Sequence, residues 1–226
     1  MSAEPYLILF DVDGTLVDSQ RMIVACMETA FRAFDREPPS RQQTLSIVGL
    51  SLEDAFMRLV GDDLDAPIRA MAARYKQAFF DLRASADRDE PLYPGAREAI
   101  GLLSRRPDVL LGVATGKSRR GLQSVLDHHG LTGTFVTLQS SDDHPSKPDP
   151  SMVLEALRET GVKPERAVII GDTTYDIEMG RAARINTVGV SWGYHEVERL
   201  TAVGAEVILN DYAELEPALA RLFQWR

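Results

Sequence analysis

The sequence predicts an α/β protein: a Rossmann-like parallel sheet core with helices on both faces and an inserted α-helical bundle as a cap domain. Two observations predict this fold. Residues 1–16 and 92–226 carry short apolar runs that alternate with helical stretches, which is typical of a parallel sheet covered on both faces. Residues 17–91 show apolar residues at helical spacing and no convincing strand. We therefore expect 1–16 and 92–226 to form the core and 17–91 to form the cap.

Six apolar runs are the candidate strands of the core. In chain order they are Tyr6–Phe10, Val109–Ala114, Thr134–Leu138, Ala167–Ile170, Thr187–Val190 and Val207–Leu209. Ligands of such sheets bind beyond the carboxyl ends of the strands. The side chains that directly follow these runs are therefore the candidates for a functional site.

Three amphipathic stretches predict the helices of the cap. Ser19 can cap the first, the segment 51–54 resembles a capping box before the second, and the third runs from Ile68 to Leu82. Helices with one apolar face need partners, which a small bundle supplies. The two linkers to the core, 17–19 and 89–95, are candidate hinges.

Composition excludes several classes of function. The 226 residues carry 25 basic and 34 acidic side chains, a net charge of -9, which argues against a general partner of nucleic acid or of acidic membranes. No segment approaches the ~20 apolar residues that span a bilayer. The single cysteine, Cys26, lies on an apolar helical stripe and is expected to be buried. We expect a cytoplasmic protein.

Two carboxylates follow the first strand directly. Asp11 and Asp13 are two positions apart, so both can lie on one side of an extended backbone, and Gly14 then turns the chain away. Clustered carboxylates repel each other unless a cation or a proton offsets their charge. This pattern indicates a metal site in which one aspartate attacks and the other handles protons. A strand that ends in a solvated Asp-Gly turn would also fit.

Two further segments offer groups that could hold a phosphoryl oxygen. Thr115 stands at the end of the second strand, where it could bind an anion or simply cap the next helix. Lys147 precedes a proline, which restricts its backbone, and a fixed ammonium can offset phosphate charge. For Lys117, Arg119 and Arg120 we expect a solvated helix face.

A second acidic pair follows the fourth strand. Asp172 ends that strand and Asp176 comes four positions later, where a helix should begin. A cation shared with Asp11 explains Asp172 better than helix capping does. Asp176 could bind this cation through water or orient Lys147. Hard oxygen ligands favour Mg²⁺ over zinc.

Together these segments resemble the haloacid dehalogenase superfamily, specifically its phosphatases with a helical cap. The resemblance is carried by DVDGTL at 11–16, the strand end at Thr115, SKPDP at 146–150 and GDTTYD at 171–176, in the family's order. Similarity to phosphoglycolate phosphatase-like members is supported by IVGLS at 47–51 and VSWG at 190–193.

The resemblance implies a role for each site residue. Asp11 would be the nucleophile, and Asp13 the acid and base for the leaving alcohol and the water. Thr115 and Lys147 would hold the phosphoryl group. The Asp11 side chain, the Asp13 backbone carbonyl and Asp172 would bind magnesium, with Asp176 in support. We also expect Thr15, Gly49 and Gly116 to approach the substrate, a small-molecule phosphate ester.

Other activities fit the same motifs. A sugar-phosphate mutase resembling β-phosphoglucomutase would return the phosphoryl group to an intermediate, and a pyrophosphatase is a further alternative. A receiver-like signalling domain also combines magnesium, aspartate, threonine and lysine, but it needs no helical insertion. Asp13 argues against the dehalogenases, which lack a carboxylate there because halide departure requires no proton.

Overall fold

The computed structural model describes residues 4–84 and 90–225. Its sheet contains six parallel strands in the order β3-β2-β1-β4-β5-β6, so β1 lies in the middle of the sheet. The strand bounds are β1 Tyr6–Phe10, β2 Val109–Thr115, β3 Thr137–Ser140, β4 Ala167–Gly171, β5 Asn186–Val190 and β6 Val207–Leu209. The predicted α/β class with a parallel sheet is confirmed.

Helices cover both faces of the sheet because the central strands are apolar on both sides. Ile8 and Phe10 face the cluster that contains α5 (Ala96–Leu103), α6 (Arg119–His128) and α10 (Leu215–Phe223). Leu7 and Leu9 face the cluster that contains α7 (Ser151–Thr160) and α8 (Thr174–Ala182). All four of these strand residues are fully buried. The remaining elements are α9 (Val197–Ala202) and the short 3₁₀ helices Pro164–Arg166 and Tyr212–Glu214.

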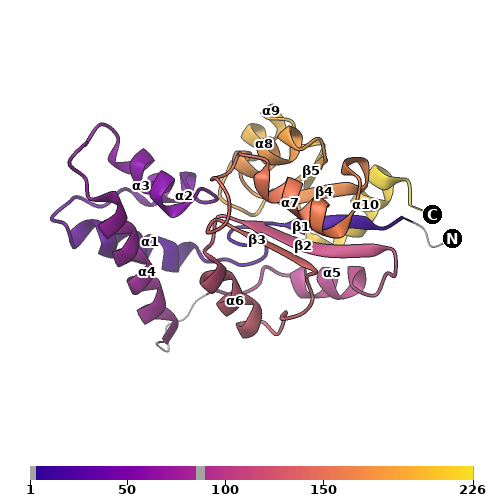
Figure 1. The fold of residues 1–226 in the computed structure, drawn as a ribbon, viewed down its shortest axis with the longest axis horizontal. Coiled ribbons are helices and arrows are strands. Elements are labelled where there is room, and N and C mark those ends of the chain that lie inside the picture. The colour runs from indigo at the N-terminus through magenta and orange to yellow at the C-terminus, as the bar shows by residue number, and fades with distance from the viewer. Residues whose placement is uncertain (1–3, 85–89, 226) are drawn as a thin grey trace.

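The segment after β1 forms a separate group of four helices (Figure 1). They are α1 (Gln20–Arg32), α2 (Arg41–Ser46), α3 (Leu52–Val60) and α4 (Ile68–Ala84). Their apolar faces pack on one another around Met27, Phe31, Phe56 and Met71. Figure 1 shows this group at the end of the sheet toward which the strands run.

The chain crosses between the helical group and the sheet at one place. Val17 pairs with Leu92 in an antiparallel bridge. The amide of Asp18 donates to Pro91 O at 2.9 Å, and the amide of Tyr93 donates to Leu16 O at 2.9 Å. The two linkers predicted as hinges therefore run side by side, although Asp89 lies outside the described residues.

Two local predictions need correction. The third strand begins at Thr137, not at Thr134, because Thr134 closes a turn onto Leu131 and the parallel ladder with β2 continues to Ser140. Segment 51–54 makes only half of a capping box: Ser51 Oγ accepts from the Asp54 amide and donates to the Asp54 carboxylate at 2.6 Å. The Asp54 side chain is thus turned to the hydroxyl and not to the backbone.

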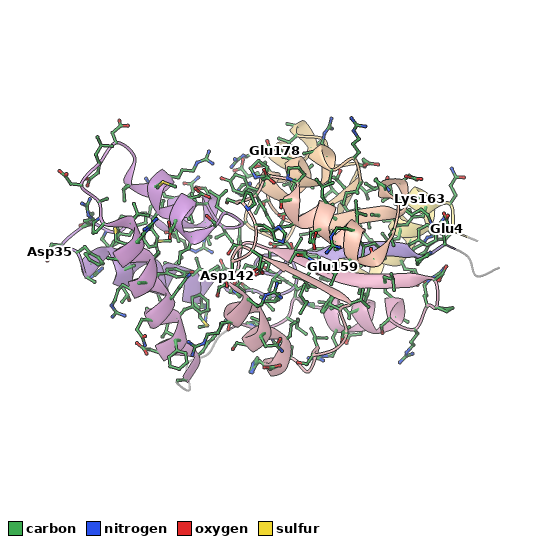
Figure 2. All side chains as sticks on the ribbon, viewed as in Figure 1. Glu4, Asp35, Asp142, Glu159, Lys163 and Glu178 are labelled. Atoms are coloured by element: carbon green, nitrogen blue, oxygen red, sulfur yellow. The ribbon has the colours of Figure 1, made fainter. Side chains whose placement is uncertain are left out.

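Charged side chains lie over the outer surface of the molecule (Figure 2). Glu4 and Lys163, both labelled there, form an ion pair of 2.8 Å beside the beginning of β1, at the opposite end of the molecule from the four helices. In the described part of the chain, no helix combines the length and the apolar character that crossing a membrane requires.

Candidate active site

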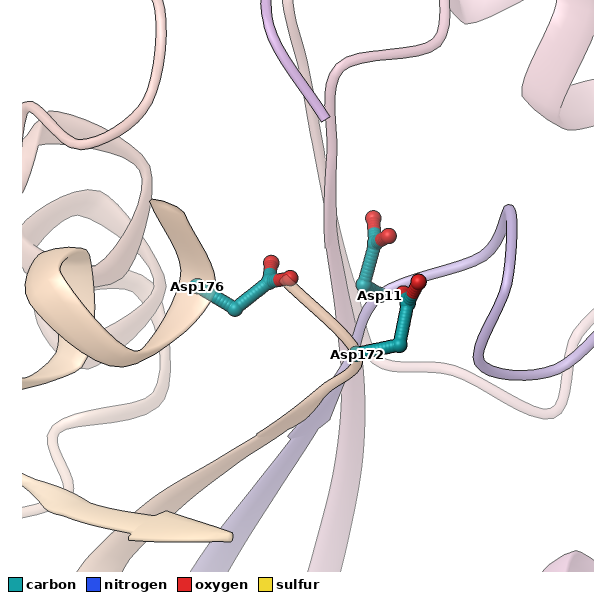
Figure 3. Close-up of side chains that lie close together, drawn as sticks. All are labelled: Asp11, Asp172 and Asp176. Carbon is teal, nitrogen blue, oxygen red and sulfur yellow. The ribbon is translucent and has the colours of Figure 1, made fainter. Parts of the chain in front are cut away.

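Three buried carboxylates meet at the carboxyl end of the two central strands. Asp11 directly follows β1, Asp172 directly follows β4, and β1 and β4 are neighbours in the sheet. Asp176 comes from the first turn of α8. One oxygen of each carboxylate lies within 4.8 Å of the others. Figure 3 shows the three side chains close together. The sheet therefore brings Asp11 together with two acidic residues that lie 161 and 165 positions later in the sequence.

Lys147 is fully buried among these carboxylates. Its ammonium donates to Asp11 Oδ1 at 2.9 Å and to Asp176 Oδ1 at 2.6 Å. Burial alone would lower its pKa, but the charges of Asp11 and Asp176 outweigh burial and raise the pKa above its ordinary value. Lys147 is therefore a fixed cation at the bottom of the site. Asp176 is thus in contact with Lys147, and its role, orienting the lysine or binding a cation through water, stays a prediction.

The buried charges do not balance. Burial, and after it the nearby carboxylates, raises the pKa of Asp11 to about 6 and that of Asp172 well above its ordinary value. Among the described residues, Asp11 Oδ2 is a buried oxygen without a hydrogen-bond partner. Three carboxylates, one ammonium and an unpartnered oxygen fit a bound divalent cation with oxygen ligands.

Asp172 is held tightly on all sides. Its two carboxylate oxygens accept from the hydroxyl of Thr15 and from the amide of Tyr194, each at 2.9 Å. A Cβ at Gly14 would lie 2.2 Å from Asp172 Oδ2, and a Cβ at Gly193 would lie 2.0 Å from Asp172 Cβ. Gly14 also has φ +84, which a side chain would strain. The two glycines thus leave just enough room for this carboxylate.

Asp176 serves the helix as well as the lysine. Its Oδ2 accepts from the amide and from the hydroxyl of Thr173, at 3.1 and 2.6 Å, and Thr173 in turn caps α8. The helix cap is therefore Thr173 and not Asp172, which leaves Asp172 available to a ligand. Because Oδ2 is used by the cap, Oδ1 is the oxygen that faces Lys147.

Asp13 points to a different set of partners. Its carboxylate accepts from Lys117 Nζ at 2.6 and 2.8 Å and from the hydroxyl of Ser19. The prediction of a solvated Lys117 is wrong: its side chain is 9% exposed. Residues of the helical group and its linker cover it, since the ring of Phe79 lies 5.1 Å away and Glu90 lies 3.8 Å away. The prediction that the Ser19 side chain caps this helix is also wrong: Ser19 stands at the N-cap of α1, but its hydroxyl makes no cap bond because it donates to Asp13.

The other predicted residues lie around this centre. Thr115 is buried at the end of β2, and its hydroxyl accepts from the Lys117 amide at 3.3 Å. Gly116 abuts Gly49, since a Cβ at Gly116 would lie 2.5 Å from Gly49 O. Thr15 is fully buried and its hydroxyl is used by Asp172. A direct contact of Thr15, Gly49 or Gly116 with substrate stays a prediction.

Sequence reasoning missed the residues that join the helical group to the sheet. His195 Nδ1 accepts from the Thr174 amide at 3.1 Å, so its Nε2 carries the proton and donates to Ser46 O at 3.1 Å. Burial lowers the pKa of His195 and so favours this neutral form. The hydroxyl of Tyr175 donates to the same Ser46 carbonyl at 3.1 Å. The only signal in the sequence is that Tyr175 and His195 each follow a strand that ends at the site.

Comparisons with known proteins agree on one family. The model of the haloacid dehalogenase-like hydrolases matches residues 8–190. A relative from Dickeya dadantii, named "Probable phosphatase IndB", is 31% identical over 96% of this chain and 95% of its own length. A phosphoglycolate phosphatase from Nitrosococcus oceani is 27% identical over 98% of this chain and 99% of its own. A haloacid dehalogenase-like family hydrolase from Streptococcus pneumoniae has the same fold, with a TM-score of 0.81, 23% identity, and 95% and 98% of the two chains covered.

Proposed function

Because the chain is a phosphatase of the haloacid dehalogenase-like hydrolase family, we propose that it hydrolyses a small-molecule phosphate monoester through an aspartyl-phosphate on Asp11, with magnesium. The observation that carries this proposal is the buried cluster of Asp11, Asp172, Asp176 and Lys147, with Asp13 two residues beyond Asp11. Burying charged groups costs free energy, so a solvated surface turn would leave these side chains exposed to water.

In the proposed first step, Asp11 attacks the phosphorus atom. A bond forms between an Asp11 oxygen and phosphorus, and the bond from phosphorus to the ester oxygen breaks. Asp13 gives its proton to the departing oxygen, so that an alcohol leaves and not an alkoxide. Lys147 and Thr115 hold the oxygens of the transferring group and offset their negative charge.

In the proposed second step, water hydrolyses the aspartyl-phosphate. Asp13, now ionised, takes a proton from the water while the water oxygen attacks phosphorus. The bond between phosphorus and Asp11 breaks, and inorganic phosphate leaves. Splitting the displacement in this way replaces one slow reaction by two easier ones.

The metal would be held by the Asp11 side chain, the Asp13 backbone carbonyl and Asp172, with Asp176 in support. When bound, magnesium would supply charge that lets an anionic carboxylate approach an anionic ester. The unpartnered oxygen of Asp11 and the raised pKa values of Asp11 and Asp172 support these ligands.

We propose that residues 17–91 act as the cap of this site. The cap would exclude water and place the leaving group. The contact between Gly49 and Gly116 supports an approach of the cap loop 47–51 to the substrate.

The names of the relatives suggest the substrate. The protein from Nitrosococcus oceani is named a phosphoglycolate phosphatase. We propose a small phosphorylated metabolite of this type, bound by the chain without nucleic acid or membrane and in the cytoplasm. No observation favours the mutase or pyrophosphatase alternatives.

A screen of phosphorylated metabolites with magnesium tests the proposal. We expect release of inorganic phosphate from 2-phosphoglycolate or a similar small ester, and mass spectrometry of quenched enzyme should find the phosphoryl group on Asp11. A positional isomer without free phosphate would indicate a mutase, and turnover of pyrophosphate alone would indicate a pyrophosphatase. A stable phosphoenzyme without turnover would revive the receiver-like alternative.

A further inference from the structure

Lys117 lies between two carboxylates. Its Nζ is 2.6 Å from Asp13 Oδ1 and 3.8 Å from Glu90 Oε1. Asp13 belongs to the candidate active site, whereas Glu90 belongs to the outgoing linker of the helical group. The Lys117 ammonium thus lies close to Asp13, which takes part in the proposed reaction, and to Glu90, which does not.

Glu90 is itself held by an arginine of α4. Arg83 donates to both oxygens of Glu90, from Nε at 2.9 Å and from Nη2 at 2.8 Å. The Glu90 side chain is 0% exposed and that of Arg83 is 12% exposed. The backbone carbonyl of Glu90 accepts from His129 Nε2 at 2.8 Å, which ties the linker to the end of α6.

These four side chains form a row of alternating charge: Arg83, Glu90, Lys117 and Asp13. The ring of Phe79 lies beside both cations, 4.6 Å from the guanidinium and 5.1 Å from the ammonium. Phe79 and Arg83 are one turn apart on α4. The row therefore runs from a helix of the proposed cap to the proposed acid and base of the reaction.

We propose that Arg83 and Glu90 are positioning residues for Asp13 and act on it through Lys117. This inference rests on the proposed role of Asp13. The two hydrogen bonds from Arg83 compensate the charge of Glu90. Lys117 can therefore donate its two short hydrogen bonds to the carboxylate of Asp13. Lys117 and Ser19 then fix the direction in which the Asp13 carboxylate points.

Loss of Arg83 should move Lys117. Without the guanidinium, the buried carboxylate of Glu90 loses two charged hydrogen bonds, and a buried charge of this kind draws in a compensating cation. Lys117 Nζ, now 3.8 Å from Glu90 Oε1, has to move about 1 Å or less to make a hydrogen bond with it. The Asp13 carboxylate would then be held by Ser19 without the ammonium.

A crystal structure of Arg83→Met gives the direct test. We expect Lys117 Nζ at hydrogen-bond distance from Glu90 and beyond it from Asp13, whereas the wild-type crystal should keep the contacts described above. If Lys117 Nζ is still within hydrogen-bond distance of the Asp13 carboxylate in the variant, the inference is overturned. If Arg83→Met does not fold, Arg83→Lys serves instead, because it keeps the charge but cannot make both bonds.

Kinetics test the consequence for Asp13. The first step needs a proton for an alkoxide but not for p-nitrophenolate, so we compare kcat/KM for 2-phosphoglycolate and p-nitrophenyl phosphate. Arg83→Met should lower kcat/KM for the alkyl ester about tenfold or more, because a small displacement of the acid costs this much. It should leave kcat/KM for the aryl ester unchanged. An equal loss on both esters would indicate a merely structural role and contradict the inference.

Two further variants complete the experiment. Glu90→Gln in the Arg83→Met background removes the carboxylate that draws Lys117 away, so it should return Lys117 to Asp13 and restore most of the lost kcat/KM. Failure of this restoration would overturn the inference. Arg69→Met is the control, because Arg69 lies on the same helix with its side chain 91% exposed. This variant should change kcat/KM for neither ester. If wild type hydrolyses no alkyl ester, the proposed function fails, and the position of Lys117 in the crystals still decides the present inference.

Discussion

Asp11 combines burial with a negative charge. Its carboxylate is buried, shares Lys147 with Asp176, and keeps one oxygen without a partner among the described residues. An isolated ionised group in such surroundings would be strongly unfavourable, so the fold retains it only because neighbouring side chains hold it. The reactive character of Asp11 therefore follows from where the sheet places it.

Replacing Asp11 by asparagine should abolish turnover. The amide has the same shape but is a very poor nucleophile, and we expect less than about 10⁻³ of wild-type kcat, in line with the loss of other nucleophiles. Lys147 keeps its contact with Asp176, so thermal unfolding should stay cooperative. Phosphate release and circular dichroism measure the two effects.

Asp65→Asn on the exposed surface is the matched control and should behave as wild type. Substantial phosphate release by the Asp11 variant, with a clean control, would contradict the proposed mechanism.

Magnesium binding should weaken as the pH falls. The pKa of Asp11 is raised to about 6 and that of Asp172 is raised as well, so both groups hold protons at acid pH that a metal must displace. Binding therefore releases protons, and affinity should drop about tenfold per pH unit for each proton displaced below pH ~6. Calorimetric titration at about pH 5 and about pH 7.5 measures this difference.

Equal magnesium affinity at the two pH values would show that these carboxylates are not the ligands. The same titration in buffers of different ionisation enthalpy counts the protons released.

Lys117 shows why single residues are harder to predict than strands. A lysine at the beginning of a predicted helix is ordinarily solvated, and nothing in its own segment indicates otherwise. Its burial comes from Phe79 and Glu90, which lie in another part of the chain. Asp11 and Asp172, in contrast, follow apolar runs directly, so their place in the sheet could be predicted from local pattern alone.

At the scale of elements, the sheet meets the helical group through backbone as well as side chains. The end of β2 and the loop after α2 touch at Gly116 and Gly49: a Cβ at Gly116 would lie 2.5 Å from Gly49 O, so Gly116 has no room for a side chain. Nearby, the carbonyl of Ser46 accepts from Tyr175 and His195. Backbone atoms therefore set the distance between the end of β2 and the loop after α2.

Gly116→Ala should disturb this junction. Its new Cβ would lie 2.5 Å from Gly49 O and 2.7 Å from Leu50 O, so the loop 47–51 has to move. We expect a loss of about 1–3 kcal/mol in the free energy of unfolding, typical of overpacking, and a higher KM. Denaturant titration and steady-state kinetics measure the two.

Gly101→Ala in α5 is the control. A Cβ there meets nothing within 4 Å, so helix propensity should make this variant slightly more stable without a change in KM. An unchanged KM in Gly116→Ala would count against an approach of loop 47–51 to the substrate.

The elements of the sheet were predicted well because buried parallel strands are apolar throughout. The third strand was placed too early, because its second half, Gln139 and Ser140, is polar although buried. Gln139 makes up for its burial by donating to Thr137 and Glu159. Such partners come from tertiary structure, so a hydrophobic pattern cannot reveal them.

At the scale of the whole molecule, the helical group is an insertion whose two ends meet. The bridge between Val17 and Leu92 joins residues on either side of all four helices. Ser19 and Glu90, at the inner ends of the linkers, both take part in the contacts around Asp13 and Lys117. Helices between the two linkers could be predicted from the change in pattern, whereas these contacts could not.

The Val17–Leu92 bridge has a thermal consequence. Holding the two ends of the long segment between Val17 and Leu92 together costs chain entropy. The single bridge between them cannot offset this cost unless the helices of the segment are folded. If those helices melt first on heating, the ends separate, so that Ser19 leaves Asp13 and Glu90 leaves Lys117 while the strands stay paired. We therefore expect turnover to vanish at a lower temperature than the change in fluorescence of Trp192 and Trp225, which pack against the core of the sheet. Simultaneous loss of both would mean that the insertion and the sheet melt as one cooperative unit.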